Sequence, residues 1–236
     1  MSTEPFAIRL PANPSAVTLG EHQALIIDDF LLAPEAMRSA ALAAEFSQYP
    51  GYENKKGYPG IRAIAPYAYS VNLTLFLEPL LKAFFNVPTE LDIRKSVCAF
   101  SLTTMTPQEL GPLQRTPHFD ASTPHHLAVL LYLCGEEHGG TAFYRHNATG
   151  IQRLTAENRE HYLDVYYEEI NRRRPAMRYF DESDEQFTRV GFIPAKFNRL
   201  VAYRGSLLHS ACINPKLSIG TDPRVHRLTV NTFYDF

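Results

Sequence analysis

The residues with the clearest chemical potential are a histidine and an aspartate two positions apart. His118 and Asp120 lie just before an apolar run at residues 127–134. In an extended chain, side chains two residues apart point the same way, about 6.5 Å from each other, so both can reach one metal ion. One more imidazole would complete a set of two histidines and one carboxylate, which leaves three adjacent coordination positions open and suits non-haem Fe(II).

The third ligand must come from elsewhere in the chain. The candidates are His125, His126, His138, His146, His161, His209 and His226. We favour His209, because it belongs to an alternating run in the C-terminal part of the chain and would lie on a separate strand. His138, His146 and His161 lie in stretches typical of the surface, and we expect them there.

The C-terminal stretch offers an anion-binding group. Arg227, Thr229 and Asn231 alternate with apolar residues, so they share one face of a predicted strand. That face could belong to an edge strand and be solvated. Alternatively, the Arg227 guanidinium could pair in bidentate fashion with a ligand carboxylate, with the Thr229 hydroxyl as a second donor. Arg224 is a rival for this role, but it precedes the alternating strand and lacks the following hydroxyl.

The elements that would position these residues are mainly strands. Strand patterns occur at residues 24–32, 94–104, 127–134, from 141, and at 199–203, 206–209 and 227–236. Helical patterns occur at residues 35–46, 70–86 and 155–174. The run at 127–134 is too short and too apolar for a surface helix, and we expect a buried strand there.

The chain length favours one domain. We interpret residues 1–236 as a single domain, with an extended Pro-rich arm at 1–23 and a helical insertion at about 150–185. We expect residues 52–62, which are rich in Gly and Tyr, to form a loop, and this is one candidate lid over a site. The tyrosines and arginines of 162–174 could form another lid or a homodimer contact.

Composition excludes several functions. With 23 Lys and Arg against 25 Asp and Glu, the net charge is −2, which leaves no basic excess for general nucleic-acid binding. The three cysteines form no C-x-x-C pair, so we expect neither a disulfide framework nor a thiolate zinc site. The start lacks the apolar core of a signal peptide, and no window of 18 apolar residues occurs. We therefore expect a cytoplasmic protein without a membrane partner.

Taken together, the motifs carry a family resemblance. His118-x-Asp120, the apolar strand, the Gly139-Gly140 turn, His209 and Arg227-x-Thr229 resemble the Fe(II)/2-oxoglutarate-dependent dioxygenases, in particular their prolyl-4-hydroxylase-like branch. The opening at residues 26–35 is also similar to that branch, so the likeness extends over residues 24–46 and 95–236.

The resemblance implies a mainly β (α+β) fold: a double-stranded β-helix, that is, a cupin-like jelly roll, with packed helices. It implies that His118, Asp120 and His209 ligate Fe(II) and that Arg227 pairs with the C5 carboxylate of 2-oxoglutarate. Thr229 would assist Arg227, and Tyr132 would be a further co-substrate contact, although a core tyrosine would explain Tyr132 equally. With O2, such an enzyme would hydroxylate a small molecule or a peptide or protein side chain.

Two features depart from that branch. Prolyl hydroxylases have Lys where this chain has Arg227, and the interval of 18 residues from His209 to Arg227 is longer than usual for the superfamily. A prolyl substrate therefore does not follow. Arg62, beside a Pro-Gly turn, could receive an anionic group of the substrate or could be a solvated surface arginine.

Two other functions are compatible with the same residues. A non-catalytic jelly-roll protein, a sensor or scaffold, could bind a metal or small ligand in the cavity, although it would not need the complete ligand set and an anion clamp. A Zn(II) hydrolase could use the same three metal ligands, but Arg227 would then have no role.

Overall fold

The chain folds into two antiparallel sheets. The computed structural model describes residues 4–48 and 57–236. The large sheet contains, in spatial order, β1 (Pro14–Leu19), β2 (His22–Ile27), β9 (Leu200–Arg204), β6 (His126–Tyr132), β11 (Leu228–Asp235), β5 (Lys95–Thr103), β4 (Gly60–Ile64) and β3 (Ser47–Gln48). The small sheet contains β10 (His209–Ile213), β7 (Gly139–His146) and β8 (Phe187–Pro194). The prediction of a mainly β fold is confirmed.

Strand β6 shows why the large sheet is apolar on both faces. Leu127, Val129 and Leu131 pack into the cluster formed with the first two helices. The alternate residues belong to the cluster shared with the small sheet, where Leu130 and Tyr132 are buried. A strand covered on both sides needs apolar residues at every position, which explains the uninterrupted run in the sequence.

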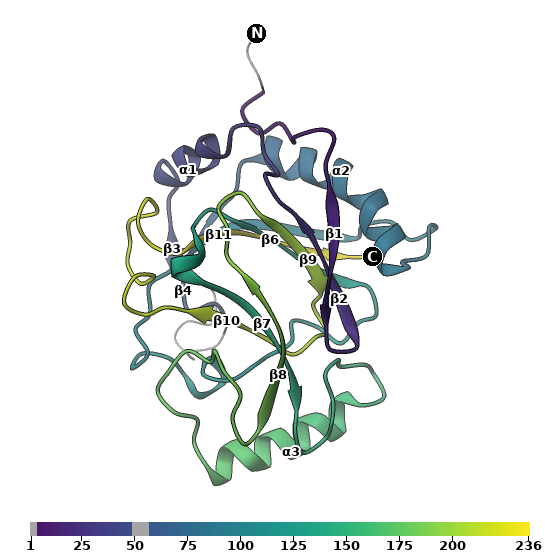
Figure 1. The fold of residues 1–236 in the computed structure, drawn as a ribbon, viewed down its shortest axis with the longest axis vertical. Helices are drawn as coiled ribbons and strands as arrows, with labels where there is room; N and C mark the ends of the chain where they lie inside the picture. Colours follow the sequence, from purple (N-terminus) through teal and green to yellow (C-terminus); the bar gives the residue numbers. More distant parts are fainter. Residues whose placement is uncertain (1–3, 49–56) are drawn as a thin grey trace.

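Helices α1 (Pro34–Leu42) and α2 (Tyr67–Phe85) cover the outer face of the large sheet (Figure 1). Pro34 lies in the first turn of α1, where its missing N–H costs no hydrogen bond. The buried stripe of α2 repeats every four residues, at Tyr69, Leu73, Leu77, Leu81 and Phe85. The helix ends at Asn86, whose φ of 51° is the left-handed conformation common at helix ends.

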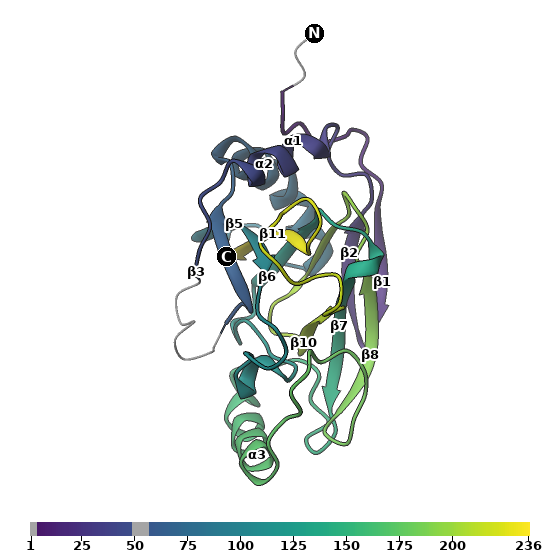
Figure 2. The same ribbon diagram turned by 90° about the vertical axis from the view of Figure 1, so that its left-hand side faces the viewer.

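Helix α3 (Arg159–Arg172) lies at the opposite end of the molecule from α1 and α2, as Figures 1 and 2 show. Its buried residues Tyr162, Tyr166 and Ile170 pack against the side chains of the small sheet, among them Tyr144 and Phe187. The predicted helix at residues 155–174 is therefore present in a shorter form. It is a structural layer of the fold.

Three sequence expectations differ from the structure. Residues 14–19, placed in the extended arm, form β1, which pairs with β2 through a turn at Gly20. A strand was expected at 206–209, but β10 begins only at His209. The Leu207 amide donates to the carbonyl oxygen of Arg204, so the preceding residues form a turn. Most of the lid predicted at residues 52–62 lies outside the described residues, and residues 60–62 form part of β4.

No helix in the described part of the chain has the length and apolar character required to cross a membrane. The connectivity of a jelly roll remains a prediction.

Candidate metal centre

Backbone hydrogen bonds hold the His118–Asp120 segment against the start of β10. His118 and His209 each donate their amide N–H to the other's carbonyl oxygen, both at 2.8 Å. The Asp120 amide donates to the carbonyl of Gly205 at 2.7 Å. The segment is extended but is no part of a sheet strand beyond this single bridge. These hydrogen bonds nevertheless fix the positions of both His118 and Asp120 relative to the start of β10.

The three predicted ligands meet in space. His118, Asp120 and His209 each offer one ligand atom, and these atoms lie within 4.8 Å of one another. Within the described residues, no other group of three such side chains comes as close. The Nε2 atoms of His118 and His209 are 3.9 Å and 3.7 Å from the two carboxylate oxygens of Asp120. The arrangement provides two imidazole nitrogens and one carboxylate for a single ion.

The protonation state of His209 is set by its own turn. Its Nδ1 lies 2.8 Å from the carbonyl oxygen of Leu207, which can only accept, so Nδ1 carries the proton. The Nε2 lone pair is therefore directed at the site. Such a hydrogen bond fixes the tautomer and the ring orientation of a metal-binding histidine.

The metal-free site favours neutral histidines. Burial lowers the pKa of His209 to about 4. Burial, helped by the neighbouring His209, lowers the pKa of His118 to about 4 as well, although 53% of the His118 side chain is exposed within the cavity. Burial raises the pKa of Asp120, against the effect of the positive groups near it. A metal requires unprotonated imidazoles, so the histidines are ready to bind near neutral pH.

Gly205 allows the ligands to approach. A Cβ atom at this position would lie 2.4 Å from Cδ2 of His126 and 3.1 Å from Oδ2 of Asp120. The first distance is far shorter than a carbon–carbon contact permits. Glycine in the turn after β9 thus allows the observed position of the His126 ring and the close approach of Asp120.

Helix α3 buttresses the same segment from the other side. The hydroxyl groups of Thr116 and Tyr166 are 2.5 Å apart, and both residues are buried. The rings of Phe119 and Tyr162 meet edge to face with centroids 6.1 Å apart. The sequence suggests that residues 162–174 form a lid or a dimer contact, whereas Tyr162 and Tyr166 pack against the segment that carries His118 and Asp120.

The three ligands open into a cavity of about 400 Å³ between the two sheets. Arg227 also lines this cavity, although only 1% of its surface is exposed. Its Nε and Nη2 atoms are buried and have no hydrogen-bond partner among the described residues. Its guanidinium carbon lies 5.8 Å from the centre of the Tyr132 ring. The cavity therefore contains a buried positive charge with unused donors.

The residues around Arg227 do not all reach the cavity. Asn231 lines it, whereas Thr229 and Tyr132 are fully buried and are not among the residues that line it. The Thr229 hydroxyl donates to Oδ1 of Asn231 at 2.6 Å. The Tyr132 hydroxyl is 2.5 Å from that of Thr141, which does line the cavity. Direct co-substrate contacts of Thr229 and Tyr132 remain predictions.

Other sequence candidates lie elsewhere. Arg224 is exposed, forms a 2.7 Å ion pair with Asp222 and does not line the cavity. The expectation of surface positions was wrong for His138 and His146, which are 7% and 0% exposed. His146 fills a structural site instead, with Nε2 2.8 Å from the carboxylate of Glu169.

Sequence reasoning missed Tyr203, which lines the cavity and presents its ring to His209 at a centroid distance of 4.9 Å. The two-residue alternation of β9 would have placed it on the same face as Val201, but nothing in the sequence indicates which face meets the metal.

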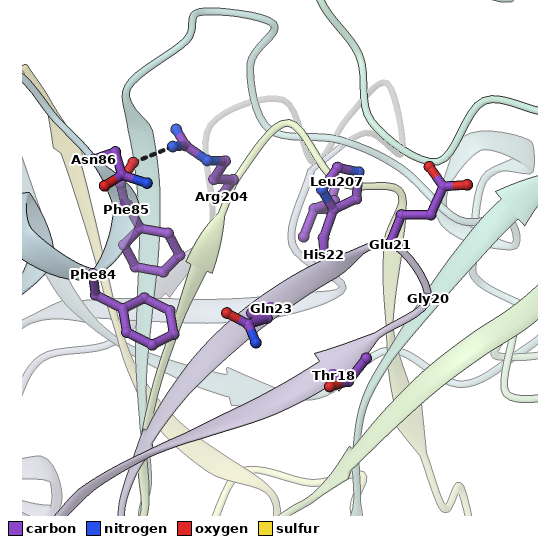
Figure 3. Close-up of a pocket in the computed structure, with 10 residues that line it drawn as sticks. All are labelled: Thr18, Gly20, Glu21, His22, Gln23, Phe84, Phe85, Asn86, Arg204 and Leu207. Atoms are coloured by element: carbon purple, nitrogen blue, oxygen red, sulfur yellow. Dashed lines mark hydrogen bonds between the residues drawn. The ribbon is translucent and has the colours of Figure 1, made fainter.

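A second cavity, of about 330 Å³, lies at the end of β1 and β2 near the end of α2 (Figure 3). It also contains an arginine and a histidine, Arg204 and His22. The Arg204 guanidinium donates to the carbonyl oxygens of Phe85 and Pro124. Two of its nitrogens thus donate to the protein backbone.

The chain matches the model of a family of unknown function, DUF6445, over residues 11–234, and it belongs to that family. No curated protein sequence matches it.

Among solved structures, the chain is similar to HygX from Streptomyces hygroscopicus with nickel, 2-oxoglutarate and hygromycin B bound. The identity is 14% over 89% of this chain and 82% of that chain, with a TM-score of 0.47. It is also similar to an N-substituted L-amino acid dioxygenase from Burkholderia ambifaria AMMD, at 8% identity over 94% and 93% of the two chains and a TM-score of 0.40. A second structure of that dioxygenase, in complex with alpha-KG, is 10% identical over 89% of this chain and 80% of that chain, with a TM-score of 0.36.

Proposed function

We propose that this member of the DUF6445 family is an Fe(II)- and 2-oxoglutarate-dependent oxygenase that hydroxylates a small molecule or a side chain of a peptide or protein. One observation carries the proposal: a two-histidine, one-carboxylate cluster and a buried arginine with unused donors open into the same cavity. A metal site alone would not require that arginine.

The donor set fits Fe(II). Two neutral imidazoles and one carboxylate are the ligands that non-haem iron takes in oxygenases, and they leave positions for other ligands. His118, Asp120 and His209 would hold the ion. The absence of thiolates from the cluster argues against a structural zinc site, which is typically built with cysteine.

The arginine fits a dicarboxylate. A buried guanidinium without a partner is costly, and a bidentate carboxylate is the ligand that best satisfies it. In this proposal Arg227 binds the distal carboxylate of 2-oxoglutarate, while the other end of the co-substrate reaches the metal. Asn231, held by Thr229, adds a polar contact in the cavity.

When bound, Fe(II) supplies the oxidative chemistry with O2 and 2-oxoglutarate, which is converted to succinate and CO2. The protein's own part is to orient the ligands through the backbone bridges at His118 and Asp120. Leu130 and Phe233 add apolar side chains to the cavity lining.

The test is anaerobic titration of the purified protein with Fe(II) and 2-oxoglutarate, followed by its visible metal-to-ligand charge-transfer absorption. We expect the band in the natural protein and its loss in His209→Ala and Asp120→Ala. His161→Ala removes an exposed histidine outside the site and should leave the band unchanged. A band that survives both ligand substitutions would contradict the proposed site.

Succinate formation under air then separates an oxygenase from a sensor with the same fold. An enzyme should produce succinate slowly even without its primary substrate, whereas a non-catalytic binder should show the absorption band and no succinate.

A further inference from the structure

We propose that the Tyr203 hydroxyl donates a hydrogen bond to the 2-oxo acid end of 2-oxoglutarate, the end that the metal would bind. This role rests on the proposed function, and it adds a protein donor at the other end of the co-substrate from Arg227. Tyr203 lies on β9, is 2% exposed and lines the cavity.

The hydroxyl of Tyr203 has no partner of its own. Among the described residues, none forms a hydrogen bond with it. Two other tyrosines line the cavity, and their hydroxyl groups are engaged: that of Tyr58 lies 3.0 Å from the Thr103 hydroxyl, and that of Tyr179 donates to the carbonyl oxygen of Met105 at 2.6 Å. A buried tyrosine hydroxyl normally has a partner, and a ligand in the cavity would supply one here.

The packing of Tyr203 needs its ring but not its hydroxyl. The ring meets those of Phe143 and His209 edge to face, with centroid distances of 5.0 and 4.9 Å. Phe143 and His209 are themselves partners in the register of β7 and β10, and their ring centroids are 6.3 Å apart. A phenylalanine would make the same ring contacts, so packing does not explain the hydroxyl.

The sheet register directs Tyr203 toward the cavity. Tyr203 pairs with Ala128 on β6, and Ala128 pairs with Phe233 on β11. Residues directly opposite one another in neighbouring strands point to the same face of a sheet. Phe233 also lines the cavity, so this row of residues belongs to the face that carries the site.

Tyr203 lies beside the metal ligands. Its ring contacts that of His209, and the carbonyl oxygen of Gly205, two residues further along the chain, accepts the Asp120 amide at 2.7 Å. Burial and the Asp120 carboxylate raise the pKa of Tyr203, whereas Arg227 lowers it. The phenol group is therefore within electrostatic range of both the metal ligand and the arginine.

A phenol at this place suits the 2-oxo acid end of the co-substrate. In the proposed function Arg227 takes the distal carboxylate, and the carboxylate and keto oxygens of the other end lie beside the residues that hold the metal. Those oxygens can only accept hydrogen bonds, and the Asp120 carboxylate cannot donate one. The Tyr203 hydroxyl can donate, and a hydrogen bond to a charged acceptor is stronger than one between neutral groups.

The experiment is an anaerobic titration of the full chain, loaded with Fe(II), with two 2-oxo acids. 2-Oxobutyrate has the same 2-oxo acid group as 2-oxoglutarate but no distal carboxylate. The charge-transfer absorption of the bound acid gives a Kd for each compound. Competition for Mn(II) with a chelator, without either acid, measures the metal affinity separately.

We expect Tyr203→Phe to weaken the binding of both acids by the same factor, about tenfold or more, as for one hydrogen bond to a charged group. Arg227→Gln should weaken only 2-oxoglutarate, because 2-oxobutyrate has no group for this arginine. Tyr234→Phe is the matched control: it removes a fully buried hydroxyl that does not line the cavity, and it should change neither affinity.

Stability separates this role from a structural one. Without ligand, Tyr203→Phe should keep the melting temperature of the natural protein, because no hydrogen bond to a described residue is lost. Tyr234→Phe should lower it, because the Tyr234 hydroxyl lies 3.0 Å from that of Thr74.

Three results overturn the inference. One is an unchanged affinity for both acids in Tyr203→Phe. The second is a loss confined to 2-oxoglutarate, which would place the hydroxyl at the distal carboxylate, and the third is a loss of Mn(II) affinity, which would assign the hydroxyl to Asp120. Failure of the proposed function looks different, because the natural protein would then show no charge-transfer band with 2-oxoglutarate.

Discussion

Two cavities of similar size, about 400 and 330 Å³, differ in how their arginines are satisfied. In the cavity of Figure 3, Arg204 donates to the carbonyl oxygens of Phe85 and Pro124 and thereby ties the end of α2 to β9. In the metal-site cavity, Arg227 is almost completely buried and keeps two nitrogen atoms without a partner among the described residues. Size and composition do not separate a binding site from a structural one, but unused hydrogen-bonding capacity does.

The largest expected effect is on 2-oxoglutarate affinity, when each of the two arginines is replaced separately. Arg227→Gln should weaken 2-oxoglutarate binding about 100-fold or more, because loss of one partner of a buried charge pair costs about 2–5 kcal/mol. Arg204→Gln should leave that affinity unchanged and lower the melting temperature, because it removes hydrogen bonds to two carbonyls. Calorimetric titration with Mn(II) and 2-oxoglutarate measures the first effect and thermal unfolding the second. Equal losses of affinity in both variants would remove the distinction between the cavities.

A smaller effect is expected from Gly205→Ala. The added Cβ would collide with the His126 ring and would crowd Asp120, so the ring must move and the carboxylate must shift by a few tenths of an ångström. We expect metal affinity to fall by about 10- to 100-fold, the usual consequence of disturbing the support of a metal ligand. The measurement is competition for Mn(II) with a chelator of known affinity.

Gly150→Ala is the matched control for Gly205→Ala. Gly150 has a φ of 71° and no atom within 4 Å of an added Cβ, so its substitution strains the backbone without touching the site. It should lower stability and leave metal affinity intact. A normal affinity in Gly205→Ala would mean that the position of Asp120 does not depend on this turn.

These sites show which parts of the molecule the sequence could predict. The pattern at 127–134 predicts β6, and the spacing of His118 and Asp120 predicts that they share a face, because both depend on local periodicity. His209 is only the favoured one of seven histidine candidates in the sequence, and the structure brings it to the pair. The role of Gly205 could not be predicted, since it arises from the close approach of residues 120–126 to a turn far away in the chain. The contact of Tyr166 with Thr116 could not be predicted either, because the two residues are far apart in the chain. Through this contact α3, which the sequence suggested as a lid, packs against the segment that leads to His118.

A third effect is confined to acidic pH. Without metal, the pKa values of His118 and His209 are lowered by burial to about 4, against about 6.5 in the unfolded chain. Between pH 6.5 and 4 the unfolded state binds more protons, so the stability of the metal-free protein should fall as the pH is lowered through this range. The raised pKa of Asp120 acts in the opposite direction, because a protonated carboxyl stabilises the fold and this contribution is lost as the pH rises.

Urea unfolding at several pH values measures this dependence. The double variant His118→Gln, His209→Gln should show a flatter profile than the natural protein between pH 6.5 and 4. Equal slopes in the two proteins would assign the acid sensitivity to groups outside the metal site.

The smallest effect concerns how Arg227 is assisted. The sequence predicts Thr229 as a direct donor to the co-substrate, whereas its hydroxyl donates to Asn231, which lines the cavity. Thr229→Val keeps the shape of the side chain and removes this hydrogen bond, so we expect a stability loss of about 1 kcal/mol and a less than tenfold loss of 2-oxoglutarate affinity.

A double-mutant cycle decides between the two roles of Thr229. If Thr229 acts only by orienting the Asn231 amide, Thr229→Val should not weaken 2-oxoglutarate binding any further once Asn231→Ala is present, because the two changes remove one interaction. If Thr229 binds the carboxylate itself, the two losses of affinity should add. Non-additive losses would place Asn231, not Thr229, beside the co-substrate, in the cavity that Arg227 also lines.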